Sequence, residues 1–169
     1  MLQSLAWLGQ SRTYWIALVL FGIALECAAL YYQYALDEWP CVLCIQIRIW
    51  IMAFVLLGVL ALFFTRSTGV MRLFHGLNVV IMIGLLERSW RVLAVERGWI
   101  FGDCEMDLGM PAWFALDKWF PWIFEVQTSC GYTPLIVFNI TMAEVLLVIS
   151  AALLILCATL SVASWFNKY

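Results

Sequence analysis

Residues 45–64 read IQIRIWIMAFVLLGVLALFF, a run of twenty residues whose only charge is Arg48. A helix of about 20 mostly apolar residues is long enough to cross the roughly 30 Å hydrocarbon core of a bilayer. Residues 145–164 contain no charge, and residues 14–32 contain one, Glu26. These three stretches predict membrane-spanning helices.

A fourth stretch is shorter than the other three. Residues 73–86 are uncharged, but Glu87 and Arg88 follow directly. By length alone this stretch is also compatible with a buried or re-entrant helix. It reaches spanning length only if the helix continues to about Val95.

The distribution of charge decides the number of spans. Basic residues in short loops tend to stay on the cytoplasmic side of a membrane. With four spans, the segments on one side carry basic residues and no acidic ones; these are residues 1–13, 65–72 and 165–169. The long segment 96–141 carries six acidic residues and falls on the other side. Three spans would place that acidic segment inside, so we predict four, with both termini cytoplasmic.

We therefore expect an all-α integral membrane protein, a four-helix transmembrane bundle in one membrane domain of residues 1–169. The expected helices span residues about 14–32, 45–64, 73–95 and 143–165, and the expected outer loops span about 33–44 and 96–141. Composition agrees, because the chain is 66% hydrophobic and 12% charged, whereas soluble domains are about 45–50% apolar and about 25% charged. Membrane lipid is the expected surrounding. The net charge of −2, with scattered basic residues, argues against a nucleic acid partner.

Two local patterns predict further structure near the outer face. Residues 111–126 mix large aromatic and aliphatic side chains with three charged ones, which favours a short interfacial helix lying on the bilayer. The alternative is a loop that packs on its own aromatic residues. Thr141 followed by Glu144 is typical of a capping box, which satisfies free N–H groups at the start of a helix.

The six cysteines divide by position. On the four-span topology, Cys27 and Cys157 lie within helices, where we expect them to be small packing residues. The other four fall in the outer loops; they are Cys41, Cys44, Cys104 and Cys130.

Cys41 and Cys44 form a C-x-x-C motif directly before the second helix. Cysteines at a helix N-terminus lie near free N–H groups and the positive end of the helix dipole, which favours thiol–disulfide exchange. Arg48 follows Cys44 by four residues, so both lie on one helix face. A charge inside a membrane usually has a function, although Arg48 could instead reach the headgroups. For the motif, half of a zinc site or a structural disulfide are the alternatives.

Cys104 and Cys130 lie in the long outer loop, where a disulfide between them would be a structural staple or a redox group. The only histidine, His75, lies near the inner end of the third helix. A Cys-His hydrolase and a His-ligated metal site at the outer face are therefore excluded. Thiol–disulfide exchange needs neither a histidine nor a metal, because the thiolate is both nucleophile and leaving group.

These features together resemble a known family. PCVLCIQIR at residues 40–48 opens the second helix, and the long loop contains LDKW at residues 116–119 between its two cysteines. With four predicted helices, the chain resembles the bacterial disulfide bond formation protein B (DsbB) family over essentially its whole length. The resemblance implies a thiol:quinone oxidoreductase of the bacterial inner membrane, with its redox cysteines on the periplasmic side.

The resemblance also implies roles for individual residues. The partner would be a periplasmic, DsbA-like thioredoxin-fold oxidase whose thiolate attacks Cys104, with Cys130 as the pair of Cys104. Reduction would then pass to the Cys41–Cys44 disulfide. Cys44 would meet a membrane quinone, ubiquinone or menaquinone, and Arg48 would polarise that quinone. Such an oxidase is itself strongly oxidising, so its electrons need an acceptor of higher potential.

The chain departs from the family at one position. The resemblance implies a histidine near the outer end of the third helix, and the sequence has none there. We expect Arg91, Glu87 or Arg97 to take its place. Glu26 resembles a family carboxylate, for which helix packing and a proton path are both open.

Three other classes of protein are alternatives. A paralogue dedicated to one specific oxidase would have the same motifs. A vitamin K epoxide reductase would carry its C-x-x-C after the loop cysteines, in the last helix, whereas here the motif comes first. A four-helix adhesion or scaffold protein with a stapled outer loop would need neither the C-x-x-C motif nor Arg48.

Overall fold

The computed structural model describes residues 7–65, 67–101, 107–137 and 140–166. Four long helices form the molecule: α2 (Arg12–Ala35), α3 (Val42–Phe64), α4 (Thr68–Glu96) and α7 (Met142–Phe166). Each is long and apolar enough to cross a membrane. The predicted four-helix membrane bundle is confirmed. The short apolar stretch belongs to α4, the longest of the four helices, so the re-entrant alternative is wrong.

The long helices begin earlier than the hydropathy pattern predicts, and a side chain caps the start of α2, α3 and α7. Ser11 accepts a hydrogen bond from the Tyr14 N–H at 3.2 Å, so α2 begins at Arg12. At α7 the predicted capping box is confirmed: the Glu144 carboxylate accepts from the Thr141 N–H at 3.2 Å, and the Thr141 hydroxyl accepts from the Glu144 N–H at 3.4 Å. These bonds satisfy N–H groups that lack partners inside the helix.

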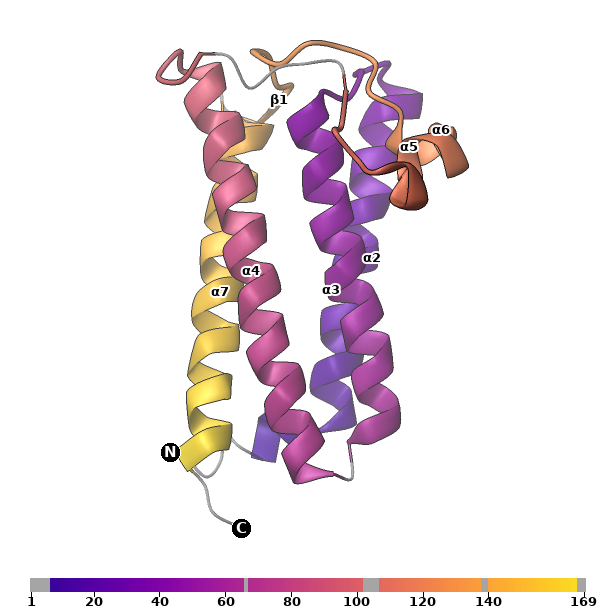
Figure 1. Cartoon of the computed structure of the whole chain (residues 1–169). Helices are drawn as coiled ribbons and strands as arrows, with labels where there is room; N and C mark the ends of the chain where they lie inside the picture. The colour runs from indigo at the N-terminus through magenta and orange to yellow at the C-terminus, as the bar shows by residue number, and fades with distance from the viewer. Residues whose placement is uncertain (1–6, 66, 102–106, 138–139, 167–169) are drawn as a thin grey trace.

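Helix α3 packs against α2 on one side and α4 on the other, and α4 packs along α7 (Figure 1). Two glycines allow the close approaches. A Cβ at Gly22 of α2 would lie 2.5 Å from Cγ2 of Val55 in α3, and a Cβ at Gly84 of α4 would lie 2.6 Å from the Trp50 ring. Within the described residues, α2 and α7 form no comparable interface. The bundle is therefore tightly packed along three of its four sides.

The end of the bundle that is predicted to face outward, called the outer end below, carries the irregular structure. A 3₁₀ turn (Ala112–Phe114) precedes two four-residue helices, α5 (Leu116–Trp119) and α6 (Pro121–Phe124), beside the outer part of α2 and α3 (Figure 1). The sequence predicts one interfacial helix here. Instead there are three short turns, because Pro111 and Pro121 each start a new one. Their tryptophans are exposed, as an interfacial segment requires; they are Trp113, Trp119 and Trp122.

A small antiparallel hairpin leads into the last helix. Its strands are β1 (Leu135–Val137) and β2 (Ile140–Thr141), with Leu135 opposite Thr141. The sequence analysis does not predict these strands. They are too short for alternation of apolar and polar residues to be recognised.

The inner half of the bundle buries several polar side chains. His75 is 1% exposed, with Nε2 3.1 Å from the carbonyl of Gly9, and the Trp15 indole donates to the same carbonyl. Asn78 donates to the sulfur of Cys157 at 3.3 Å. Cys157 is fully buried, which agrees with a packing role. Cys27 is exposed on α2 instead, where lipid would surround it.

Candidate functional site

The C-x-x-C motif lies where α3 begins. Cys41 is the N-cap residue, and its sulfur accepts a hydrogen bond from the Cys44 N–H at 3.3 Å. The two sulfurs are 2.7 Å apart. Cys41 is buried, whereas Cys44 is half-buried in the first turn of the helix. The pair is therefore close enough for exchange between a dithiol and a disulfide.

A segment of the long outer loop lies against this motif. The N–H of Gln127 donates to the carbonyl of Pro40 at 3.0 Å, and Thr128 forms a parallel bridge with Cys41. Cys130 follows and hydrogen-bonds to Cys41 through its side chain. Three of the four outer cysteines thus lie together. Cys104 lies outside the described residues.

The contact between Cys41 and Cys130 was not predicted from the sequence. Eighty-nine residues separate the two cysteines, and their meeting depends on backbone hydrogen bonds that no side-chain pattern encodes. The resemblance implies that reduction passes from the Cys104–Cys130 pair to Cys41–Cys44, but it does not say which cysteines meet. The structure adds that Cys130 lies beside Cys41.

The surroundings of Cys41 control its protonation. The hydrogen bond with Cys130 favours the Cys41 thiolate, but the hydrogen bond with Cys44 and the loss of hydration on burial outweigh it. Together they raise the pKa of Cys41 to about 12. Cys41 therefore keeps its proton at neutral pH, and it can donate that proton to the neighbouring sulfur of Cys44.

Arg48 lies one turn deeper in α3 and is 5% exposed. Its Nη1 donates to Oε1 of Gln33 at 2.6 Å and to the Ile123 carbonyl at 2.9 Å, while Nη2 donates to the Ala29 carbonyl at 3.0 Å. Protein groups, rather than headgroups, hold the guanidinium, so the snorkelling alternative is wrong. Five N–H groups are available on an arginine, and Nε–H and one Nη2–H of Arg48 have no bond to the described residues.

Glu26 lies about one turn inward from the Arg48 contacts on α2. It is 8% exposed, and neither carboxylate oxygen has a hydrogen-bond partner among the described residues. It interacts electrostatically with Arg48. Burial of a carboxyl group without hydrogen bonds is costly, and both helix packing and a proton path stay predictions for Glu26.

A cavity of about 350 Å³ opens beside Cys44 and Arg48. Its walls come from α2, α3, α7 and the loop segments above them, and one residue of α4, Val92, also contributes. Most of the lining is apolar; examples are Leu25, Ile51, Val145, Leu146 and Ile149. Ligand sites are commonly about 300–1,000 Å³, mainly apolar, with a few placed polar groups. This cavity fits an apolar molecule that carries one or two hydrogen-bond acceptors.

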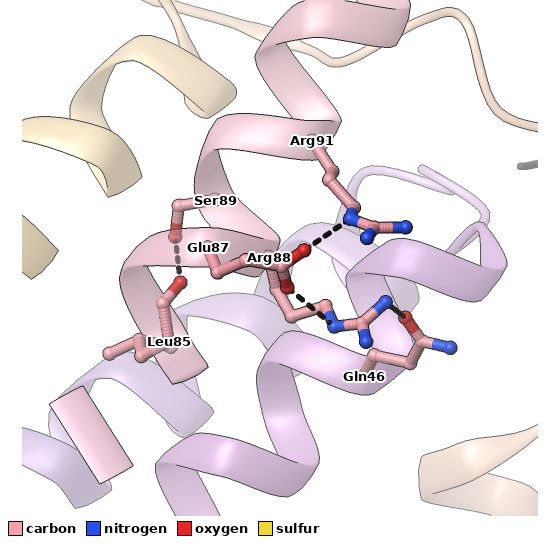
Figure 2. Close-up of polar contacts among 6 residues, drawn as sticks. All are labelled: Gln46, Leu85, Glu87, Arg88, Ser89 and Arg91. Atoms are coloured by element: carbon pink, nitrogen blue, oxygen red, sulfur yellow. Dashed lines mark hydrogen bonds and ion pairs between the residues drawn. The ribbon is translucent and has the colours of Figure 1, made fainter. Parts of the chain in front are cut away.

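The residues expected to replace the missing histidine do not line this cavity. Glu87 pairs with Arg91 and, at 3.0 Å, with Arg88, and Arg88 donates to Gln46 of α3 at 3.0 Å (Figure 2). Arg97 pairs with Glu144. Arg91, Glu87 and Arg97 are not among the residues that line the cavity. All three side chains form ion pairs, and a role of one of them in place of the histidine stays a prediction.

Gln33 is a site residue that the sequence analysis missed. It is 5% exposed and bonds to both Arg48 and, through Nε2, Oε1 of Gln127 at 3.4 Å. The available signal was a lone amide near the outer end of an apolar helix. Such an amide is costly to bury unless both its donor and its acceptor groups are used.

Comparison with known proteins gives matches over most of the chain. The family model "Disulfide bond formation protein DsbB" matches residues 11–160. The chain is 26% identical over 164 residues to disulfide bond formation protein B of Photorhabdus laumondii, covering 94% of each chain. It is 30% identical over 166 residues to the protein of the same name from Haemophilus influenzae, covering 96% of this chain and 93% of the relative. It is 31% identical over 127 residues to disulfide bond formation protein B 2 of Pseudomonas aeruginosa, covering 72% and 73%.

Proposed function

The chain belongs to the DsbB family of disulfide bond formation proteins, and from this premise we propose that it is a thiol:quinone oxidoreductase. It takes two electrons from a DsbA-like thioredoxin-fold oxidase and passes them to a membrane quinone, ubiquinone or menaquinone. Family membership and the four spans make it a multi-pass membrane protein that takes part in disulfide formation. The positive-inside pattern supports placement in the bacterial inner membrane with the cysteines facing the periplasm.

One observation carries the proposal. The C-x-x-C motif contacts the loop that carries Cys130 through Cys41, and it borders the apolar cavity through Cys44. A thiol relay between a protein in water and an acceptor in lipid must be reachable from the water and from the lipid. Cys41 contacts the loop on the water side, and Cys44 borders the cavity on the lipid side.

The contacts support a specific order of exchange. The thiolate of the reduced partner attacks a Cys104–Cys130 disulfide at Cys104, which releases Cys130 as a thiolate. Cys130 then attacks Cys41, so a Cys41–Cys130 disulfide forms and Cys44 leaves as a thiolate beside the cavity. The second partner thiol displaces Cys104, so the partner leaves oxidised by two electrons and both electrons are now on this protein.

The residues around the cavity fit a quinone. Its apolar walls suit a ring and an isoprenoid chain, and the uncommitted N–H groups of Arg48 suit a carbonyl oxygen. Attack of the Cys104 thiolate on Cys130 would restore the Cys104–Cys130 disulfide and release Cys41, and oxidation of the Cys41–Cys44 dithiol to its disulfide would supply the two electrons and two protons that convert a bound quinone to quinol. Arg48 would orient the ring and stabilise negative charge on it. Glu26, buried near Arg48, is available to carry a proton.

The experiment that tests the proposal is quinone reduction by the purified protein with a reduced DsbA-like oxidase. Ultraviolet absorbance follows the loss of quinone. We expect Cys44→Ser to abolish turnover, because no thiolate then borders the cavity. Cys104→Ser should lose turnover with the oxidase but keep slow turnover with a small dithiol, which can reduce Cys41–Cys44 directly.

Cys27→Ser is the matched control, because Cys27 lies on the exposed face of α2. We expect it to leave turnover unchanged. Full quinone reduction by the Cys44→Ser protein would refute the mechanism. No reduction by the wild-type protein with any quinone would refute the function itself.

A further inference from the structure

Two polar contacts tie the outer loop to the helices below it. Arg48 donates to the carbonyl of Ile123, and Gln33 donates to Oε1 of Gln127. Both acceptors lie in the short segment that ends at Cys130. Arg48 and Gln33 are also bonded to each other, at 2.6 Å. The loop is thus fastened at two points to one buried pair of side chains.

The amide of Gln33 makes both of its bonds possible. Its oxygen accepts from Arg48, and its nitrogen donates to Gln127. An amide carries a donor and an acceptor on the same group, whereas an ionised carboxylate only accepts and an apolar side chain does neither. Gln33 is 5% exposed, so water cannot easily replace either bond.

The Gln127 contact lies at the point that sets the position of Cys130. The backbone N–H of Gln127 donates to Pro40, the residue before Cys41, and Thr128 bridges to Cys41 itself. One residue lies between Thr128 and Cys130, and two lie between Gln127 and Cys130. Holding the Gln127 side chain therefore restricts how far the Cys130 sulfur can move from Cys41.

We propose that Gln33 is a positioning residue, which links the arginine of the cavity to the loop and thereby holds Cys130 against Cys41. This proposal rests on the proposed function for its purpose, because the Cys41–Cys130 exchange is a step of the relay. The property that Gln33 controls is the effective concentration of the Cys130 thiol at Cys41.

The test measures that property without a quinone or a partner protein. In the full chain carrying Cys44→Ser and Cys104→Ser, Cys41 and Cys130 are the remaining outer cysteines. The protein is equilibrated in glutathione redox buffers, its thiols are trapped by alkylation, and mass spectrometry gives the fraction of Cys41–Cys130 disulfide. The equilibrium constant against glutathione is the effective concentration.

In this background we expect Gln127→Leu to lower the effective concentration about fivefold, the loss of one typical hydrogen bond. Gln33→Leu should lower it by at least as much, since Arg48 also loses an acceptor. Gln127→Glu should restore it, because a carboxylate also accepts from the Gln33 amide. Gln127 is exposed, so its variants test the link even where Gln33→Leu fails to fold.

Gln46→Leu is the matched control. Gln46 lies in the same helix as Arg48 and also bonds to an arginine, Arg88, but it faces α4 and has no hydrogen bond to the described residues of the loop (Figure 2). We expect it to leave the Cys41–Cys130 equilibrium unchanged. An unchanged equilibrium in Gln127→Leu, or an equal fall in Gln46→Leu, would overturn the proposal. Neither result depends on quinone reduction. Failure of the proposed function would appear in the quinone assay and not in this equilibrium.

Discussion

The two ends of the bundle both bury polar side chains and a cysteine, but they differ in what lies beside them. At the outer end, Cys44 lies in the first turn of α3 and borders an apolar cavity of about 350 Å³, with Arg48 on the same wall. At the inner end, Cys157 lies in the middle of α7, fully buried, and accepts a bond from Asn78.

The difference indicates that placement, and not residue type, separates a reactive thiol from a packing one. The outer cysteines have a second thiol within reach, a helix start and access from two directions. The inner cysteine has close packing on every side. A thiol needs a partner and a route of approach before its chemistry can be used.

The largest expected effect concerns reactivity within the outer site. With its pKa raised to about 12, Cys41 in the reduced protein should carry on the order of a thousandfold less thiolate at neutral pH than an ordinary cysteine. Its alkylation rate should rise about tenfold per pH unit up to pH 10, without a plateau. Peptide mass spectrometry after timed alkylation measures this rate. A plateau below pH 9 would contradict the assignment.

The next effect tests the arginine in the wall of the outer cavity, a feature that the inner end lacks. Arg48→Ala removes charged hydrogen bonds, each worth about 1.5–3 kcal/mol, so we expect the KM for quinone to rise about ten- to a hundredfold. Steady-state quinone reduction at varied quinone concentration measures it. Arg88→Ala is the control, because Arg88 does not line the cavity; an equal rise in that variant would mean that Arg48 has no special role.

The smallest effect is expected at the inner end. Cys157→Ala removes one buried sulfur and the bond from Asn78, which should lower the free energy of unfolding by about 1–2 kcal/mol. Turnover per folded molecule should change less than about twofold. Thermal unfolding and quinone reduction on the same sample separate the two. A large loss of turnover at unchanged stability would give the inner cluster a part in the reaction.

Much of the fold follows from the sequence because the membrane restricts it. Hydropathy and charge bias predict the four spans, and helix periodicity places Cys44 and Arg48 on one face. The helix ends were less predictable, since capping by Ser11 and Cys41 extends two helices beyond their apolar cores. The position of the interfacial segment was predicted correctly, but its structure was not: one helix was expected, and the prolines divide the segment into short turns.

The assembly of the site could not be read from the sequence in the same way. The contact of Cys130 with Cys41 and the bond from Gln33 to Gln127 each join segments about ninety residues apart. Such contacts depend on how a loop folds back, which local patterns do not determine. The replacement for the missing histidine stays open for a related reason. The candidates were chosen by position along the chain, and in the structure they form ion pairs and do not line the cavity.

The open side of the bundle between α2 and α7 has a consequence for kinetics. These two helices both line the cavity without packing closely on each other, so an apolar substrate can arrive by lateral diffusion in the plane of the bilayer. Occupancy is then governed by the mole fraction of that substrate in lipid rather than by its molarity in the whole sample. Adding empty vesicles at constant total quinone should slow turnover, because the added lipid lowers the mole fraction of quinone in the bilayer.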